Sequence, residues 1–266
     1  MSTETAKKPQ KPPFFTLITV TKNNLTGLKS TQSTIEHQTC RDFEWVIIDG
    51  ASADDTPAHL KTLNAYTISE PDDGIYDAMN KGIKRSNGGY LLFLNAGDTL
   101  AAPNTLEHIK TAAKSAKTQP NFIYGDAIEN TGKNNAKKPA RYAKIAYGMF
   151  THHQSMLYHR ASLADLRYNL DYKIAADYDL TARFLKLHKN TLYCPIPICN
   201  FEPGGLSQTN ADLGRAEQFQ IRKKLKLTGP IHNQVIWIGQ KTLWLFRRVF
   251  PNLYWHLKSA QNQKPV

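Results

Sequence analysis

Residues 70–98 read EPDDGIYDAMNKGIKRSNGGYLLFLNAGD, and this stretch decides the fold. Asp72 or Asp73 is placed to cap the start of a helix, and Gly88-Gly89 ends the helical part before a strand. The apolar residues recur at the 3.6-residue period of an amphipathic helix, at Ile75, Ala78, Met79, Gly82 and Ile83. We therefore expect a helix that packs this apolar face on a sheet.

The strand that follows, Tyr90–Leu94, ends in Asn95-Ala96-Gly97-Asp98. Ligands of open α/β sheets bind at the carboxyl ends of strands. A carboxylate there, beside a glycine that lets the backbone approach a ligand, suits a metal ion that holds phosphates. The sequence therefore predicts a ligand site at this strand end. A plain strand-end turn before Pro103 is the alternative.

Strand-like and helix-like segments alternate through the first half of the chain, so we expect an α/β fold with a mostly parallel sheet and helices on both faces. Two prolines mark residues 191–198 as an edge strand, because proline cannot donate to a ladder. The polar residues 129–138 indicate a hairpin or a surface loop. The other expected strands are Phe15–Val20, Trp45–Ile48, Thr67–Ser69, Tyr90–Asn95 and Phe122–Asp126, and the expected helices follow Asn24, Pro57 and Pro103 or span Ala176–Leu187.

The length of 266 residues suits one large domain with an appendage. We expect a disordered leader over 1–13, a Rossmann-like domain over 14–208 and a basic amphipathic helical extension over 209–266. The three cysteines fit neither a disulfide framework nor a zinc site, which indicates a reducing compartment. The leader lacks the apolar core of a signal peptide, and no run reaches the roughly 18 apolar residues of a membrane span.

The formal net charge of +12 is concentrated after Ser207, where ten lysines and arginines face two acids. A basic tail of this kind suits a phosphate-rich partner, either lipid headgroups or nucleic acid. Within it, a single helical stripe carries Trp237, Lys241, Trp244 and Arg248. Indole rings beside cations suit the headgroup zone of an anionic bilayer. The alternative is a helix pair that packs on the main domain and exposes a solvated basic face.

Two more acidic segments are candidates for chemistry. Asp49 follows a buried strand in IIDGASADDT, where it can accept a hydrogen bond from a nucleobase or ribose, or form an Asx turn. Asp177, in IAADYDL, can cap a helix or take a proton from an attacking hydroxyl as a general base. Asp179 competes for that role, because spacing does not separate the two. Gly204-Gly205 permits close approach of the backbone to a ligand, or any tight turn.

In order, the chain carries TVTKN, IIDGASADDT, EPDDGIYDAMNKG, GGYLLFLNAGD, HQ, ADYDL and GGLS. This series resembles the family-2 glycosyltransferases with the GT-A fold, in particular the bacterial enzymes that build O-antigen, lipopolysaccharide and exopolysaccharide. The resemblance covers about Phe15 to Ser207. It implies an inverting glycosyltransferase that moves one sugar from a nucleotide-sugar, expected to be a UDP-sugar.

The resemblance also implies roles for single residues. Asp49 matches the acid that contacts the base, Asp98 the last acid of the metal motif that holds Mg²⁺ or Mn²⁺, and Asp177 the catalytic base. His153 and Gln154 are implied as contacts of the acceptor or the metal. The implied nucleotide- and donor-binding residues are Thr19, Thr21, Asp49, Asp73, Asp77, Asn80, Lys81, Asn95, Gly204, Gly205 and Ser207.

The chain departs from the family pattern at three of these segments. Asn95 stands where the metal motif usually has its first acid, with one more spacer residue, which weakens the charge available to a metal. Gly50 replaces the second acid of the Asp49 loop, and Ala176 replaces the common Glu before the base. The Arg-Trp motif of processive synthases is absent, so we expect transfer of a single sugar.

The implied acceptor is a saccharide or a saccharide on a polyprenyl diphosphate, which places the protein in the cytoplasm at the inner face of the bacterial membrane. One alternative is a catalytically silent partner subunit, suggested by Asn95 and Gly50. Another is a basic nucleic-acid-binding protein, which the acidic strand ends disfavour because they would repel phosphate; we therefore expect no nucleic-acid partner.

Overall fold

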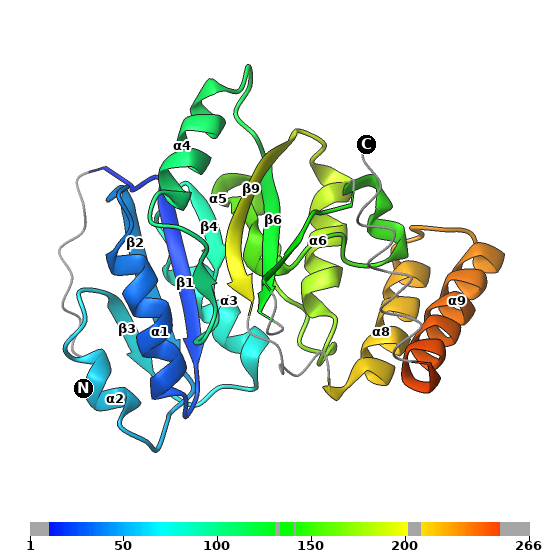
Figure 1. The fold of residues 1–266 in the computed structure, drawn as a ribbon, viewed down its shortest axis with the longest axis horizontal. Helices are drawn as coiled ribbons and strands as arrows, with labels where there is room; N and C mark the ends of the chain where they lie inside the picture. The colour runs from blue at the N-terminus through cyan, green and yellow to red at the C-terminus, as the bar shows by residue number, and fades with distance from the viewer. Residues whose placement is uncertain (1–10, 131–133, 141, 202–208, 251–266) are drawn as a thin grey trace.

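The computed structural model describes residues 11–130, 134–140, 142–201 and 209–250. Within them a nine-stranded sheet forms the centre of the molecule (Figure 1). The sheet order is β3-β2-β1-β4-β8-β6-β9-β5, with β7 beside β6. The strands are β1 Phe15–Thr21, β2 Phe43–Asp49, β3 Tyr66–Ser69, β4 Tyr90–Phe93, β5 Thr99–Leu100, β6 Phe122–Asn130, β7 Asn134–Lys137, β8 Met156–His159 and β9 Thr191–Phe201.

Parallel pairing joins β3, β2, β1 and β4, so these four strands end at one edge of the sheet. The register places Thr21 beside Asp49 and Asp49 beside Ser69. All of the residues in β1 are buried, as expected of a strand covered on both faces. The common edge follows directly from the parallel register, because each strand runs in the same direction.

The other half of the sheet is mixed. β8 is antiparallel to both β4 and β6, whereas β6 and β9 are parallel. The expected hairpin is present as antiparallel β6 and β7, and β9 pairs on its outer side with β5 only at Cys199 and Asn200. Residues 191–198 therefore lie at the edge, as their prolines predict. Parallel pairing is thus limited to part of the sheet, because β8 inserts antiparallel between β4 and β6.

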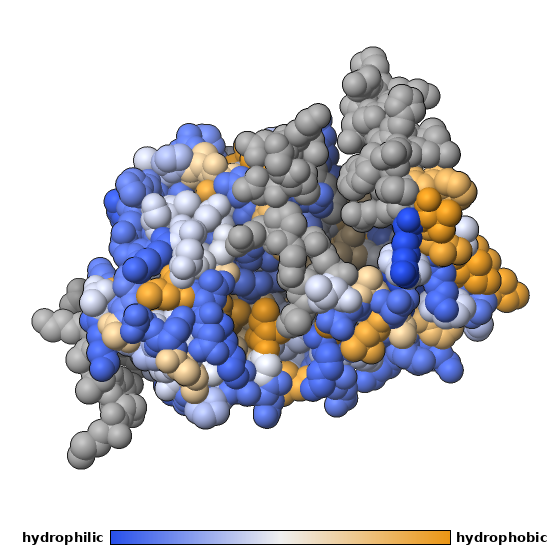
Figure 2. Space-filling model, turned by 60° about the horizontal axis from the view of Figure 1, so that its bottom comes forward, coloured by the Kyte–Doolittle hydropathy of each residue, from blue (hydrophilic) through white to orange (hydrophobic). Residues whose placement is uncertain are grey.

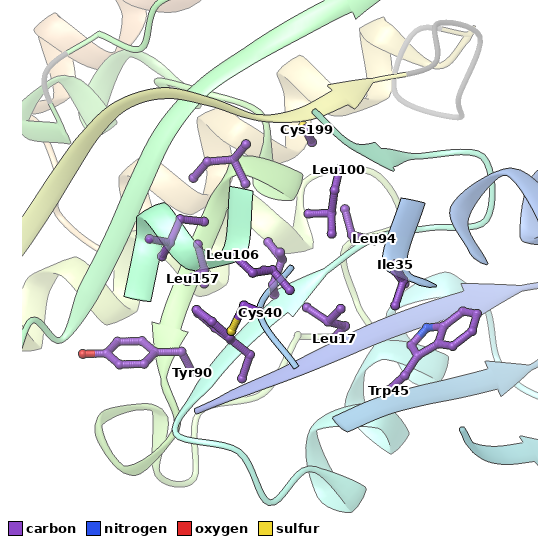
Figure 3. Packing of buried hydrophobic residues seen from close by; sticks show 14 of the residues in the cluster. Leu17, Ile35, Cys40, Trp45, Tyr90, Leu94, Leu100, Leu106, Leu157 and Cys199 are labelled. Atoms are coloured by element: carbon purple, nitrogen blue, oxygen red, sulfur yellow. The ribbon is translucent and has the colours of Figure 1, made fainter. Parts of the chain in front are cut away.

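The helices cover both faces. One buried cluster joins α1 and α4 to the sheet, and Figure 3 shows Leu17, Ile35 and Leu106 converging in it. A second cluster joins α3 and α6 to the opposite face. The helices are α1 Leu25–Glu36, α2 Thr56–Leu60, α3 Ile75–Arg85, α4 Thr105–Ser115, α5 Arg160–Leu163, α6 Ala176–Leu187, α8 Ala211–Lys224 and α9 Pro230–Val249, and single 3₁₀ turns η1 and η2 span Tyr142–Tyr147 and His153–Ser155.

The starts of two helices show where local prediction succeeds and fails. Asn24 caps α1 as expected, its side chain accepting from the Gly27 N–H at 2.9 Å. The expected cap of α3 by Asp72 or Asp73 is wrong, because Gly74 is the capping residue and makes no side-chain cap bond. Gly74 has φ of +113°, a left-handed conformation that favours glycine, and Asp72 accepts from its N–H at 3.0 Å.

The basic segment forms two helices, α8 ending at Lys224 and α9 beginning at Pro230. Helix α8 packs on α6 through Ile221, which contacts Ala175 and Tyr178. Arg222 is fully buried, and its Nε donates to Asn233 of α9 at 2.6 Å. The helix pair is therefore packed against the end of the sheet layer at the right of Figure 1.

All three cysteines are free and buried, so the expectation that they form no disulfide is confirmed. Burial raises the pKa of the Cys194 thiol to about 11 and that of Cys199 to about 12. These thiols act as small apolar core residues, and Cys40 and Cys199 are both visible in the cluster of Figure 3.

Gly88 permits the close approach that starts β4, and this generates a stability prediction. A methyl group on Gly88 would lie 2.5 Å from the carbonyl carbon of Phe15. We expect Gly88→Ala to lower the free energy of unfolding by about 1–3 kcal/mol, because backbone must move to admit the methyl group. Gly239→Ala, in the open interior of α9, is the matched control and should raise it by up to about 1 kcal/mol. Urea denaturation measures both; equal stability of Gly88→Ala and wild type would contradict this packing.

Candidate active site

Asp49 ends β2 at the common edge of the parallel strands. Its side chain is fully buried and accepts hydrogen bonds from the Ser52 N–H at 3.1 Å, the Ser52 hydroxyl and the Ser69 hydroxyl at 2.6 Å. The Ser52 N–H lies three residues after Asp49, one more than in the Asx turn given as the alternative, and Ser69 ties the carboxylate to a second strand. The serines hold the Asp49 carboxylate at the edge where a nucleotide would lie.

The two threonines of β1 differ in their surroundings. Thr19 is fully buried inside the sheet, and its hydroxyl accepts from the Trp45 indole N–H at 2.9 Å. Thr21 lies at the edge beside Asp49, and its buried hydroxyl has no hydrogen-bond partner within the described residues. Of the two, Thr21 is the one whose hydroxyl can reach a ligand.

The loop Asn95–Asp98 is fastened to the end of β1, because the Ala96 N–H donates to the Val20 carbonyl at 3.0 Å. Asp98 is 4% exposed and accepts from the Asn95 N–H at 3.2 Å and from the Gln154 amide at 2.8 Å. The Asn95 side-chain oxygen is buried and finds no hydrogen-bond partner in the described part of the chain. The loop thus places a carboxylate and a spare amide oxygen together.

The turn η2 links this loop to the start of α6. While Gln154 binds Asp98, the neighbouring His153 places its Nδ1 atom 3.7 Å from the Asp177 Oδ2 atom. Burial lowers the pKa of His153 to about 4, so this imidazole is neutral near pH 7. Its buried Nε2 atom has no partner among the described residues. The turn η2 thus contacts both Asp98 and Asp177, which are far apart in the sequence.

Asp177 lies in the first turn of α6, where its Oδ1 atom accepts from the Tyr178 N–H at 2.7 Å. Its side chain remains 21% exposed, so a substrate can reach it. Desolvation is the main cause that raises the pKa of Asp177 to about 6, and the negative charge of Glu217 adds to it. A carboxylate with this pKa is ionised at neutral pH and still basic enough to take a proton.

Asp179 is held differently. Its side chain is only 3% exposed, and its Oδ2 atom accepts from the Nε and Nη2 atoms of Arg183, each at 2.8 Å. Two guanidinium N–H groups on one oxygen form a charge-assisted contact that holds the Asp179 carboxylate in place. Asp177 and Asp179, equivalent in sequence spacing, are therefore different in access and in partners.

The residues of α3 form a network at its exposed start. Lys81 pairs with Glu70 at 3.0 Å and with Asp77 at 3.4 Å, and Asp77 accepts from the Asp73 N–H at 3.2 Å. Asn80 is already engaged, because its amide binds the backbone N–H and carbonyl of Tyr168, both at 2.9 Å. Asp73, Asp77, Asn80 and Lys81 all stay predicted contacts of the sugar donor, and Asn80 also holds the loop at Tyr168.

Asp98 and Asn95 are the candidate ligands of a divalent cation. In the described ranges, no three His, Cys, Asp or Glu side chains gather as a metal cluster. Asp98 and the unpartnered oxygen of Asn95 nevertheless supply two oxygen donors in one loop. Mg²⁺ is commonly held by one or two carboxylates together with substrate phosphates. These residues therefore fit a cation that is shared with a diphosphate.

Sequence reasoning missed three residues around Asp177. Tyr76 donates its hydroxyl to the Ile174 carbonyl at 2.7 Å, Arg183 neutralises Asp179, and Glu217 binds the loop before α6. Tyr76 could have been found from its place in the DGIYDAMN motif. Nothing in the sequence links Glu217 to the site, since it lies more than 40 residues from its partners. The predicted Gly204, Gly205 and Ser207 lie outside the described residues.

Comparisons with known proteins identify the family and the fold. The family model described as Glycosyl transferase family 2 matches residues 16–173. A PGL/p-HBAD biosynthesis glycosyltransferase of Mycobacterium bovis (strain BCG / Pasteur 1173P2) is 32% identical over 211 residues, which cover 75% of this chain and 81% of the relative.

Two solved structures share the fold. TarS 1–349 of S. aureus, in complex with UDP-GlcNAc, has a TM-score of 0.66 at 15% identity and covers 84% of this chain and 70% of its own. The mannosyltransferase PcManGT of Pyrobaculum calidifontis, in complex with GDP-Man and Mn²⁺, has a TM-score of 0.64 at 18% identity, covering 98% and 79%. The expected GT-A arrangement, an α/β sheet with helices on both faces and helices at its C-terminal end, is confirmed. The chain belongs to family 2 of the glycosyl transferases.

Proposed function

We propose that this glycosyltransferase inverts the configuration of the sugar it transfers, with Asp177 as the general base. The observation that carries the proposal is the bridge from Asp98 through the turn of Gln154 and His153 to Asp177. It joins a residue suited to the donor diphosphate with a reachable carboxylate of raised pKa. Asp49 lies at the end of a strand on the same sheet edge, where a base or ribose would bind.

The reaction balances as a single displacement. Asp177 accepts the proton of an acceptor hydroxyl, while the hydroxyl oxygen forms a bond to the anomeric carbon. The bond from that carbon to the diphosphate oxygen breaks, and the nucleoside diphosphate leaves with the electron pair. Attack from the face opposite the leaving group inverts the configuration. A divalent cation held by Asp98 would offset the charge that develops on the diphosphate.

Asp177 is favoured over Asp179 by access and by charge. The Asp179 carboxylate is enclosed and paired with Arg183, so an acceptor hydroxyl has little access to it. Asp177 has a neutral imidazole beside it and no cation within salt-bridge distance among the described residues. The loss of hydration, with no compensating positive charge, keeps its proton affinity high.

Replacing the base generates the first activity prediction. We expect Asp177→Asn to lower kcat by about 10²- to 10⁴-fold, the usual contribution of a positioned general base, while donor binding is kept. Wild-type kcat should fall by about tenfold per pH unit below pH 6, because Asp177 becomes protonated there. Steady-state release of the nucleoside diphosphate, measured across pH, checks both.

Asp179→Asn is the matched control. It weakens the ion pair with Arg183 and should lower the melting temperature while turnover and its pH dependence are kept. The base assignment would be overturned if Asp177→Asn kept full turnover. It would also be overturned if Asp179→Asn instead shifted the fall of kcat at low pH, which is the acid limb of the pH–rate profile.

We propose a UDP-sugar as donor and Mg²⁺ or Mn²⁺ as the cation. The support is the Asp49 loop, the oxygen donors of Asp98 and Asn95, and the likeness to TarS with UDP-GlcNAc. PcManGT, with GDP-Man and Mn²⁺, makes GDP the natural competitor. Titration calorimetry with UDP and GDP, with and without Mn²⁺, should show tighter binding of UDP that depends on Mn²⁺.

Asp98→Asn is the informative variant in that titration. It removes the only carboxylate of the loop and should abolish the Mn²⁺-dependent part of the affinity. Stronger binding of GDP would replace the donor assignment, and equal binding with and without Mn²⁺ would remove the cation. Failure of the wild type to bind either nucleotide would favour a catalytically silent partner subunit.

For the acceptor we propose a saccharide, free or carried on a polyprenyl diphosphate, in the synthesis of a bacterial surface polysaccharide such as O-antigen. The sequence resemblance supports this choice. A lipid-linked acceptor would bring the enzyme to a membrane, and α9 has a surface suited to that contact.

Helix α9 carries two distinct stripes. The predicted stripe of tryptophans is half-buried, because Trp237 packs against Phe219 and Arg215 lies 4.9 Å from the ring centre of Trp244. Opposite the face that contacts α8 lies a second stripe at the spacing of a helix, exposed by 51–84%. Figure 2 shows hydrophobic residues gathered along the right margin, the side of α8 and α9 in Figure 1. The stripe consists of Ile231, Val235, Ile238, Leu245 and Val249.

We propose that this stripe lies on an anionic bilayer, with the protein peripheral to the inner face of the cytoplasmic membrane. The exposed cations Lys241 and Arg248 flank the stripe, and α9 contains no acid. Apolar residues beside cations favour an in-plane helix on anionic lipid. Pairing of two copies of α9 would instead bring like charges together. In the described part of the chain, no helix combines the length and apolar character that crossing a bilayer requires.

Vesicle sedimentation checks this surface. We expect binding to phosphatidylglycerol-rich vesicles that weakens with salt, and a loss of roughly tenfold or more in Val235→Glu/Ile238→Glu. Leu187→Glu/Ser115→Glu changes exposed side chains on other helices and should bind as the wild type does, apart from the added charge. Equal loss in both variants would contradict the assignment, as would a dimer in light scattering that only the stripe variant dissociates.

A further inference from the structure

Three consecutive backbone N–H groups before α6 point at one carboxylate. Glu217, on α8, accepts from the N–H groups of Lys173 at 2.7 Å, Ile174 at 2.9 Å and Ala175 at 2.8 Å. Ala175 is the capping residue of α6 and makes no side-chain cap bond of its own. The Ala175 N–H belongs to the helix start and those of Lys173 and Ile174 to the loop before it; none has an intrahelical partner, and a carboxylate is a strong acceptor for such groups. Glu217 therefore supplies from a distant helix what the local sequence lacks.

The carboxylate of Glu217 is itself held in place. It is 8% exposed, and one turn further along α8 the fully buried Ile221 packs against Ala175 and Tyr178. One turn before it, Gly214 lies so close to Ile174 that a methyl group there would be 3.0 Å from the isoleucine side chain. Helix α8 therefore packs closely on this loop over three successive helical turns, at Gly214, Glu217 and Ile221.

The same loop is held on its other side by α3. The Tyr76 hydroxyl donates to the Ile174 carbonyl at 2.7 Å, and the Tyr76 ring stacks on Tyr168 with centroids 5.3 Å apart. The backbone before α6 is thus held from two sides, by the Glu217 carboxylate as acceptor and by the Tyr76 hydroxyl as donor. Asp177 is two residues beyond Ala175, so these contacts also fix the position of its carboxylate.

We infer that Glu217 is a positioning residue for Asp177, through which the C-terminal helix α8 sets the geometry of the base. The inference rests on the proposed function, because it assumes that Asp177 accepts the proton. Glu217 does not touch the substrate in this scheme. It holds the backbone from which Asp177 projects, and it is the acidic group of α8 that acts on the site.

The charge of Glu217 has a second effect. Its negative charge raises the pKa of Asp177, in the same direction as desolvation. The other titratable groups that face Asp177 are neutral near pH 7: His153 has a lowered pKa, and the phenols of Tyr76, Tyr158 and Tyr168 have raised ones. Glu217 is therefore the charged group whose removal shifts the titration of Asp177 toward lower pH.

The test compares Glu217→Gln, Glu217→Asp and the exposed control Glu107→Gln in the full-length protein. The glutamine variant keeps the shape but loses the charge and an acceptor oxygen. We expect its kcat to fall by up to about 100-fold with the donor KM unchanged, because a small displacement of the base is costly. Its acid limb should move to lower pH. Glu217→Asp keeps the charge but not the reach, so its kcat should fall while the limb stays near that of the wild type.

Hydrogen exchange adds a readout that needs no turnover. In Glu217→Gln the amides of residues 173–175 should exchange faster than in wild type, while those of β1 are unchanged. Unchanged exchange at 173–175, or a lower melting temperature with unaltered kcat and acid limb, would overturn the inference. If Asp177→Asn retains turnover, the proposed function fails first, and the exchange result then reports only on the capping contact.

Discussion

Everything at the site depends on the parallel register of β1 with β2 and β4. That register ends the strands together, so Thr21, Asp49 and the Asn95–Asp98 loop lie along one edge. A shift of one residue in β2 would turn the Asp49 side chain to the other face of the sheet and away from the serines that hold it. The buried side chains on both faces of β1 and β2 oppose such a shift, because each set would have to repack in the closely packed cluster on the other face.

Four carboxylates near this edge are distinguished by what surrounds them. Asp49 is enclosed by serine donors, Asp98 by an amide and a backbone N–H, and Asp179 by a guanidinium. Asp177 keeps a larger exposed fraction and receives the N–H of its neighbour, with no cation within salt-bridge distance in the described chain. Chemically identical groups thus differ in access and in partners, and the pKa of Asp177 is raised because no cation among the described residues compensates its loss of hydration.

The helical extension illustrates how a basic tail can serve a catalytic domain. One face of α8 buries Ile221 and Arg222 and directs Glu217 at the loop before α6. One face of α9 holds Asn233 and Ile236 toward α8, and the opposite face exposes an apolar stripe. A single pair of helices can therefore link the position of the proposed base to a proposed membrane-facing surface without any change in the sheet.

The sequence by itself determined the alternation of strands and helices, the span of α6, the Asn24 cap and the family, because periodicity, capping and motif order are local properties. It did not determine the mixed half of the sheet, since the antiparallel insertion of β8 between β4 and β6 depends on pairing between segments far apart in the chain. From sequence spacing alone, Asp177 and Asp179 were equal candidates for the general base. Only the tertiary structure separated them, because burial, the Arg183 ion pair and the Glu217 contact come from groups brought together by packing.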